Sequence, residues 1–185
     1  MIKTSLITIW NLLDPVYYSL SNLKQINSKT IQKSIFRVRL TKYKGPNYTL
    51  SDGTVIKRND LLVKIHLYNI KILKEIKTID NNVKKALLVY KYVKESLPDL
   101  VVYINNHVCK DDIKAIIGIT TLEKGTKRLG FDSFPITSPF YKWFKQLSWL
   151  PLTYLFSYKV KNHYPVYLFM SKQQLSNKYG QKAKV

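Results

Sequence analysis

His66 is the side chain of this sequence best suited to acid–base chemistry. It lies on the polar face of an alternating segment, 61–68, and Asn69 follows it three positions later. A neutral imidazole titrates near physiological pH, so a general acid or base at this position is chemically feasible. The alternative is a surface or half-buried histidine with one hydrogen bond, and the sequence leaves it open.

Arg128 is a second candidate because arginine is scarce, with four arginines among 31 basic residues. Arg128 follows Lys124 and Lys127 on an expected short helix. Together with Arg37 and Arg39 it can form an anion pocket for a phosphate or a carboxylate, which guanidinium groups bind through charge-assisted hydrogen bonds. A solvated charged face is the alternative.

Ser171 precedes Lys172, a pairing that can place a nucleophile beside an amine. A serine that caps the following helix explains the same residue more simply. The enzyme or ligand-binder hypothesis requires His66, Asn69, Arg128 and Ser171 to converge in one cleft. No reaction follows from these residue types alone.

Metal and cofactor chemistry finds no support in the sequence. No His-x-x-x-His or Cys/His set has ligand spacing, and the single Cys109 excludes a multi-thiolate site and an intramolecular disulfide. Carboxylates are sparse, so a glycosidase-type pair is not expected either. We therefore predict neither a metal nor a cofactor.

The segment 138–158 is the most unusual stretch of the chain. Eight of its residues are aromatic and its only charges are Lys142 and Lys145. Aromatic rings beside lysines on an apolar segment are typical of a membrane headgroup boundary. The alternative is a core helix that turns Phe140, Phe144, Leu147 and Leu150 inward. The residues expected to contact the membrane are Phe140, Trp143, Phe144, Trp149, Tyr154 and Phe156.

The formal net charge of +20, from 31 basic and 11 acidic residues, indicates a polyanionic neighbour. Lysine dominates the basic residues, which favours diffuse attraction to an anionic membrane surface or an acidic envelope polymer over specific nucleic-acid binding. Compositional bias of an A/T-rich genome is an alternative source of part of this charge. No run of about 20 uncharged apolar residues is present, which argues against a transmembrane helix. The N-terminus lacks a cleavage site, so we interpret it as mature protein. The single Cys109 fits a reducing compartment.

The periodicities predict one α+β domain over 1–185: a small, mixed, mainly antiparallel sheet with helices packed on it. An amphipathic helical segment over 1–24 precedes an α+β core over 34–136. The aromatic interfacial segment 138–158 is expected to be helical and amphipathic, and 166–179 forms a terminal strand and helix. Strands are expected at 35–43, 61–68, 113–119, 131–136 and 166–170, with a tight hairpin turn at 51–54. Helices are expected at 70–77, from 80 onward with a kink or a fresh start at Pro98, at 121–129, and from 171 to 179.

Several of these pieces together resemble one known family. They are Phe36-Arg-Val-Arg-Leu-Thr-Lys-Tyr-Lys-Gly45, Leu50-Ser-Asp-Gly-Thr54, Asn59-Asp60, Ile65-His-Leu-Tyr-Asn69, Gly118-Ile-Thr120, Gly125-Thr-Lys-Arg-Leu-Gly-Phe131 and Tyr167-Leu-Phe-Met-Ser-Lys172. Their order and spacing are similar to the YkoP-like domain of Gram-positive bacteria, which is also found appended to polysaccharide deacetylases. The resemblance implies a link to the cell envelope. It implies no catalytic residues, so none is transferred.

Two functional hypotheses follow. The first is a non-catalytic accessory module of envelope polysaccharide or glycolipid metabolism, cytoplasmic and peripheral at the inner face of the cell membrane, with an envelope glycan enzyme as a further partner. The second is a small envelope-pathway enzyme, or a binder of glycan or phosphate ligands, with a pocket around His66, Asn69 and Arg128. Whether the protein is an enzyme stays open at this stage.

Overall fold

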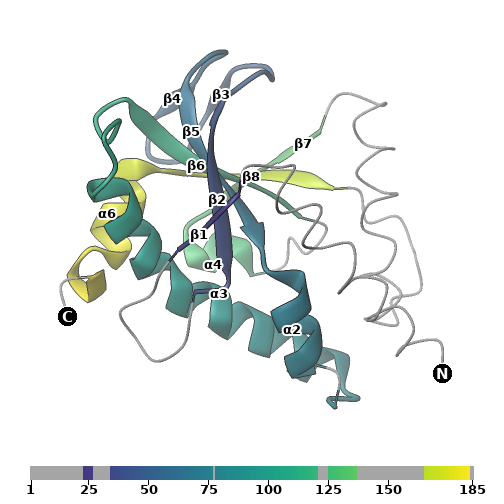
Figure 1. Cartoon of the computed structure of the whole chain (residues 1–185). Coiled ribbons are helices and arrows are strands. Elements are labelled where there is room, and N and C mark those ends of the chain that lie inside the picture. The colour runs from purple at the N-terminus through teal and green to yellow at the C-terminus, as the bar shows by residue number, and fades with distance from the viewer. Residues whose placement is uncertain (1–22, 27–33, 77, 121–124, 137–164, 184–185) are drawn as a thin grey trace.

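A six-stranded sheet forms the centre of the molecule (Figure 1). The computed structural model describes residues 23–26, 34–76, 78–120, 125–136 and 165–183. The strands of the sheet are β1 (Lys24–Gln25), β2 (Phe36–Lys42), β5 (Leu61–Leu67), β6 (Ile113–Thr120), β7 (Asp132–Pro135) and β8 (Val166–Ser171). Their order across the sheet is β1-β2-β5-β6-β8-β7.

Every neighbouring pair of strands in this sheet is antiparallel except β5 and β6. A parallel pair needs a long crossover, and the chain supplies it with two helices between β5 and β6. The mixed, mainly antiparallel sheet predicted from the sequence is therefore confirmed, together with the α+β class.

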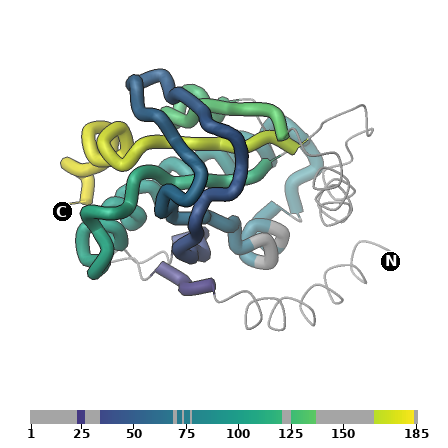
Figure 2. The backbone as a smooth tube through the Cα atoms, turned by 90° about the horizontal axis from the view of Figure 1, so that it is seen from above, coloured from purple at the N-terminus to yellow at the C-terminus, as the bar shows by residue number. Residues whose placement is uncertain are grey.

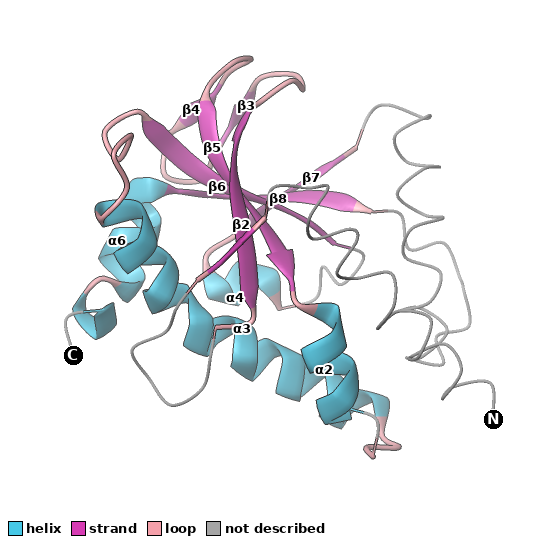
Figure 3. Ribbon diagram, in the orientation of Figure 1, coloured by secondary structure: helices cyan, strands magenta, loops and turns pink. Residues whose placement is uncertain are grey.

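The described helices lie together beneath one face of the sheet (Figure 3). Within the described residues they are α2 (Asn69–Ile76), α3 (Asn82–Asn105), α4 (Thr126–Leu129), α6 (Lys172–Tyr179) and the 3-10 turn η1 (Gln181–Ala183). Apolar side chains of β2, β5, β6 and β8 pack against α3 and α6 in the largest core cluster. Burial of this apolar surface holds the two layers together.

Alternation along β2 decides which side chains reach this core. Phe36 and Val38 point toward the helices and are 1% and 0% exposed. Because successive strand residues face opposite sides, Arg37 and Arg39 lie on the face away from the helices. On that face Arg37 is itself buried, at 7% exposed, and Arg39 is half-buried.

A short hairpin covers part of that second face. It consists of β3 (Tyr48–Thr49) and β4 (Val55–Ile56), and the view from above shows this part of the chain crossing the sheet (Figure 2). Tyr48 stacks on Phe134 with ring centroids 4.3 Å apart, and Tyr43 meets the fully buried Phe169 edge to face at 5.5 Å. These rings anchor the hairpin on the sheet.

Helix α3 runs unbroken through Pro98. The sequence predicted a kink or a fresh helix start at this proline. Leu97, Leu100 and Ile104 are 0%, 0% and 1% exposed in the core, so their burial outweighs the one backbone hydrogen bond that proline removes. The amide oxygen of Asn81 caps the helix by accepting from the backbone N–H groups of Val83 and Lys84.

The N-terminal prediction differs from the structure at its boundary. The helical segment was expected to reach residue 24, whereas Lys24 and Gln25 form β1 and pair with Val38 and Arg37. Residues 1–22 and 138–158, and with them the expected helical and membrane-contacting segments, lie outside the described residues. Within the described part of the chain, no helix is long and apolar enough to cross a membrane.

Candidate functional site

Two of the predicted site residues are direct neighbours on the face of the sheet that points away from the described helices. Arg37 on β2 lies opposite His66 on β5, and Arg39 lies opposite Lys64. Arg37 is 7% exposed, and its guanidinium carbon lies 3.9 Å from the ring centroid of Tyr68. This cation–π contact and its burial fix Arg37 within the fold, whereas His66 is half-buried.

The other predicted residues lie elsewhere. Asn69 begins α2, and the placement of its side chain is outside what the structure describes. Arg128 is exposed on α4, in the layer of the helices. The structure thus brings Arg37 and Arg39 together with His66, and it places Arg128 on the opposite side of the sheet.

Ser171 lies at the far end of the sheet from His66. The register aligns Leu62, Ala115 and Ser171 across β5, β6 and β8, and His66 is four residues further along β5. At about 3.3 Å per residue and about 4.8 Å per strand, His66 and Ser171 are separated by about 13 Å along the strands and by about 10 Å across them. No single cleft of the described residues therefore contains both side chains.

Ser171 instead serves the cap that the sequence indicated. Its hydroxyl oxygen accepts a hydrogen bond of 2.9 Å from the backbone N–H of Gln174 in the first turn of α6. The same hydroxyl donates to the carboxylate of Asp52 in the β3–β4 hairpin. One serine thus joins the end of β8 to a turn 119 residues earlier in the chain.

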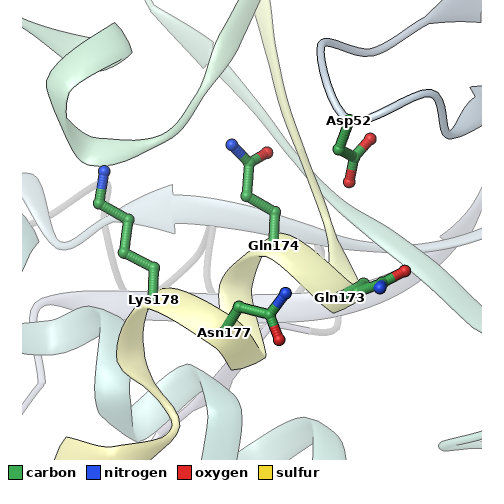
Figure 4. A pocket seen from close by; sticks show the side chains of 5 residues that line it. All are labelled: Asp52, Gln173, Gln174, Asn177 and Lys178. Atoms are coloured by element: carbon green, nitrogen blue, oxygen red, sulfur yellow. The ribbon is translucent and has the colours of Figure 1, made fainter.

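A polar pocket of about 320 Å³ lies beside this contact, and we call it the hairpin-tip pocket. Its lining residues are Asp52, Gln173, Gln174, Asn177 and Lys178. Figure 4 shows the Asp52 carboxylate directed from the hairpin toward α6, and the Gln174 side chain extending from α6 into the space between Asp52 and Lys178. Lys178 is held at the rim, because its ammonium donates 2.8 Å to the backbone carbonyl of Arg128.

The Asp52 carboxylate is held in its charged form. Burial alone would raise its pKa, but hydrogen bonds from Ser171 and from Thr54 outweigh that effect and lower the pKa. The backbone N–H of Thr54 donates to Oδ1 at 3.0 Å, while Ser171 donates to Oδ2. Both carboxylate oxygens are thereby fixed in orientation.

The base of the same hairpin carries a different kind of surface. Four cations are exposed here: Lys42 at the end of β2, Lys44 in the loop before β3, and Lys57 and Arg58 in the loop after β4. Backbone hydrogen bonds of 2.9 Å from Tyr43 to Asp60 and 2.8 Å from Asn59 to Tyr43 hold the two loops side by side. We call these four cations the basic loop patch.

The carboxylate of Asp60, beside the basic loop patch, is ionised and already paired with Lys114, a lysine outside the patch. Burial would raise the pKa of Asp60, but the backbone N–H of Lys57 and the ammonium of Lys114 lower it. The ion pair with Lys114 spans 3.0 Å, and the Lys57 N–H lies 2.7 Å from the same oxygen. The four exposed cations therefore keep their net positive field.

Sequence reasoning missed both of these sites. Lys42 and Lys44 before Gly45-Pro46, and Lys57-Arg58 before Asn59-Asp60, are visible in the sequence as basic residues next to turn signals. No local pattern marks Asp52 as a partner of Ser171, because the contact depends on the tertiary fold. Among the described residues, no group of histidine, cysteine, aspartate or glutamate side chains is arranged to hold a metal ion.

Comparison with known proteins gives two matches and one negative result. The family model of the YkoP domain matches residues 3–179. A protein of Bacillus subtilis (strain 168), described as "Uncharacterized protein YkoP", is 49% identical over 183 residues, which cover 97% of this chain and 99% of that protein. No solved structure matches significantly. The resemblance drawn from the sequence is confirmed by these matches.

Proposed function

Since this chain belongs to the YkoP domain family, we propose that it is a non-catalytic accessory module of cell-envelope metabolism that docks on an anionic membrane surface. The observation that carries the proposal is the basic loop patch. Its four cations are exposed on the end of β2 and on two loops that backbone hydrogen bonds hold side by side. A membrane can therefore meet them together, without a change in the fold.

The strength of such docking follows from the electrostatics of the membrane. Each lysine or arginine near an anionic leaflet contributes about 1 kcal/mol, so the basic loop patch supplies about 4 kcal/mol, roughly a thousandfold in affinity. This is enough for reversible docking when an apolar anchor assists. The aromatic segment 138–158 is the proposed anchor, on the strength of its sequence.

The proposed location is the inner face of the cell membrane. The cytoplasmic leaflet is the one that carries the negative surface potential in a typical cell membrane. The single Cys109 fits a reducing compartment. An envelope glycan enzyme is the kind of protein partner that the family resemblance favours.

Flotation of the full chain with lipid vesicles tests the proposal. We expect recovery with vesicles of phosphatidylcholine plus phosphatidylglycerol, little recovery with phosphatidylcholine alone, and release as the salt concentration rises, because salt screens exposed charges. Equal recovery with both kinds of vesicle, or none with either, contradicts membrane docking by charge. Salt-sensitive binding to a soluble acidic polymer without vesicle recovery would point to an envelope polymer instead.

The proposed anchor has its own test in the same assay. Replacing Trp143 and Trp149 by alanine should weaken flotation with the anionic vesicles while leaving its salt sensitivity intact. Unchanged flotation of this double variant would show that the aromatic segment does not anchor the protein, and docking would then rest on the basic loop patch.

A further inference from the structure

The hairpin-tip pocket has the chemistry of a ligand site that is distinct from the basic loop patch. Its lining contributes one carboxylate, one ammonium and three side-chain amides. Amides both donate and accept hydrogen bonds, a carboxylate only accepts, and an ammonium only donates. A lining of opposite charges and amides suits a neutral ligand whose groups are both donors and acceptors, and hydroxyl groups have that property.

Asp52 is the best-fixed group of the pocket. Ser171 and Thr54 each donate to one of its oxygens, which orients the carboxylate toward α6 (Figure 4). Each carboxylate oxygen has a second lone pair, so capacity remains for a ligand hydroxyl. A charge-assisted hydrogen bond of this kind is about twice as strong as a neutral one.

Gln174 lines the opposite wall of the pocket. Its backbone N–H donates to Ser171, the residue that also donates to Asp52, so the first turn of α6 is held beside the hairpin tip. Asp52 and Gln174 thus line the same space from different elements.

The charge and the volume of the pocket restrict the class of ligand further. Lys178 is bound to the carbonyl of Arg128, so its ammonium stays at the rim, and the ionised Asp52 disfavours phosphate or carboxylate ligands. A volume of about 320 Å³ is at the small end of ligand pockets. We propose that the hairpin-tip pocket binds a neutral polyhydroxylated ligand of the size of one sugar unit, either free or at the end of a glycan chain.

The experiment is an NMR titration of the full-length, ¹⁵N-labelled protein. The probes are glucose and N-acetylglucosamine, their linear tetrasaccharides, and inorganic phosphate as the anion. We expect saturable shifts of the side-chain amides of Gln173, Gln174 and Asn177 with the sugars and none with phosphate. If a tetrasaccharide binds more tightly than its monosaccharide, the ligand is the end of a glycan chain. If the two affinities are equal, the ligand is a single sugar. Both results support the site.

Matched variants make the test specific. Asp52→Asn keeps an acceptor for Ser171 but removes the charge, and it should weaken sugar binding about tenfold. Gln174→Leu should abolish binding, whereas Gln181→Leu, on the exposed turn η1, should leave it unchanged. Thermal unfolding of each variant shows whether the fold is retained.

Two results overturn the proposal: no saturable shift with any sugar, or shifts with phosphate alone. Vesicle docking does not use this pocket. The ligand site and the membrane-docking proposal therefore fail or stand separately.

Discussion

The two ends of the β3–β4 hairpin carry different kinds of surface: exposed cations at the base and a fixed carboxylate beside a pocket at the tip. At its base, Lys42, Lys44, Lys57 and Arg58 are exposed, and the neighbouring carboxylate of Asp60 is paired with Lys114. At its tip, Asp52 is fixed by two hydrogen bonds and faces a pocket of amides. Exposed cations attract a charged plane without directional contacts, whereas fixed groups in a hollow select a ligand by hydrogen-bond geometry.

In our two proposals, one small element separates docking, at its base, from ligand recognition, at its tip. The rings beneath the hairpin determine the position of both ends, since Tyr43 leads into one basic loop and Tyr48 into the tip. A substitution beneath the hairpin should therefore affect both ends together, whereas a substitution at the tip or at the base should affect that end alone.

The largest effect is expected from Phe169→Ala, because this ring is fully buried beneath the hairpin and contacts Tyr43, Tyr48, Phe134 and Tyr167. The cavity left behind should lower the free energy of unfolding by about 3–5 kcal/mol. Urea denaturation measures it, and amide shifts at both ends of the hairpin should accompany the loss. A loss below about 1 kcal/mol would show that the hairpin does not depend on these rings.

Ser171→Ala should affect the tip alone. It removes the cap of α6 and one hydrogen bond to Asp52, which should cost about 1–2 kcal/mol. Ser176→Ala, on the same helix, is the matched control and should change stability by less than about 0.5 kcal/mol. Equal losses in the two variants would show that Ser171 has no special role.

The same variant should also change the titration of Asp52. The folded pKa of this carboxyl is lowered, so its contribution to stability is present above the unfolded pKa and is lost as the pH falls through the folded pKa. Without the Ser171 hydrogen bond the folded pKa should rise toward its ordinary value, and the part of the stability lost in acid should shrink. An NMR titration of the carboxyl carbon measures this pKa, and an unchanged pKa in Ser171→Ala would contradict the assignment.

The smallest effect is expected at the base, from Tyr43→Phe. The hydroxyl of Tyr43 is buried and makes no hydrogen bond within the described residues. Burial raises its pKa above the ordinary value of a tyrosine, and the nearby Tyr48 and Tyr167 raise it further. Removing a buried polar group that has no partner should leave stability unchanged or raise it by up to about 1 kcal/mol. A clear loss of stability on urea denaturation would reveal a hydrogen bond that this account lacks.

Local signals predicted much of the fold. Strands β2 and β5, the hairpin turn between β3 and β4, and the serine cap of α6 are all found where the sequence placed them. These features depend on neighbouring residues, so the sequence carries them directly. Strand β1 escaped prediction because two residues are too short to show a period.

The sites were harder to predict because they depend on long-range placement. The sequence grouped Arg128 with Arg37 and Arg39, but alternation and connectivity place them on opposite sides of the sheet. It gave Ser171 a capping role but not its bond to Asp52, which only the packing of the hairpin on β8 creates. The role assigned to the aromatic segment 138–158 stays a prediction, since that segment lies outside the described residues.

Comparative flotation of two double variants tests membrane docking most directly. Lys57→Gln with Arg58→Gln removes two charges of the basic loop patch, while Lys84→Gln with Lys94→Gln removes two exposed charges of α3. Removal of the first pair should weaken binding to phosphatidylglycerol vesicles by about 2 kcal/mol, roughly thirtyfold, and removal of the second pair by much less. Equal weakening by both pairs would show that net charge, and not the basic loop patch, holds the protein at the membrane.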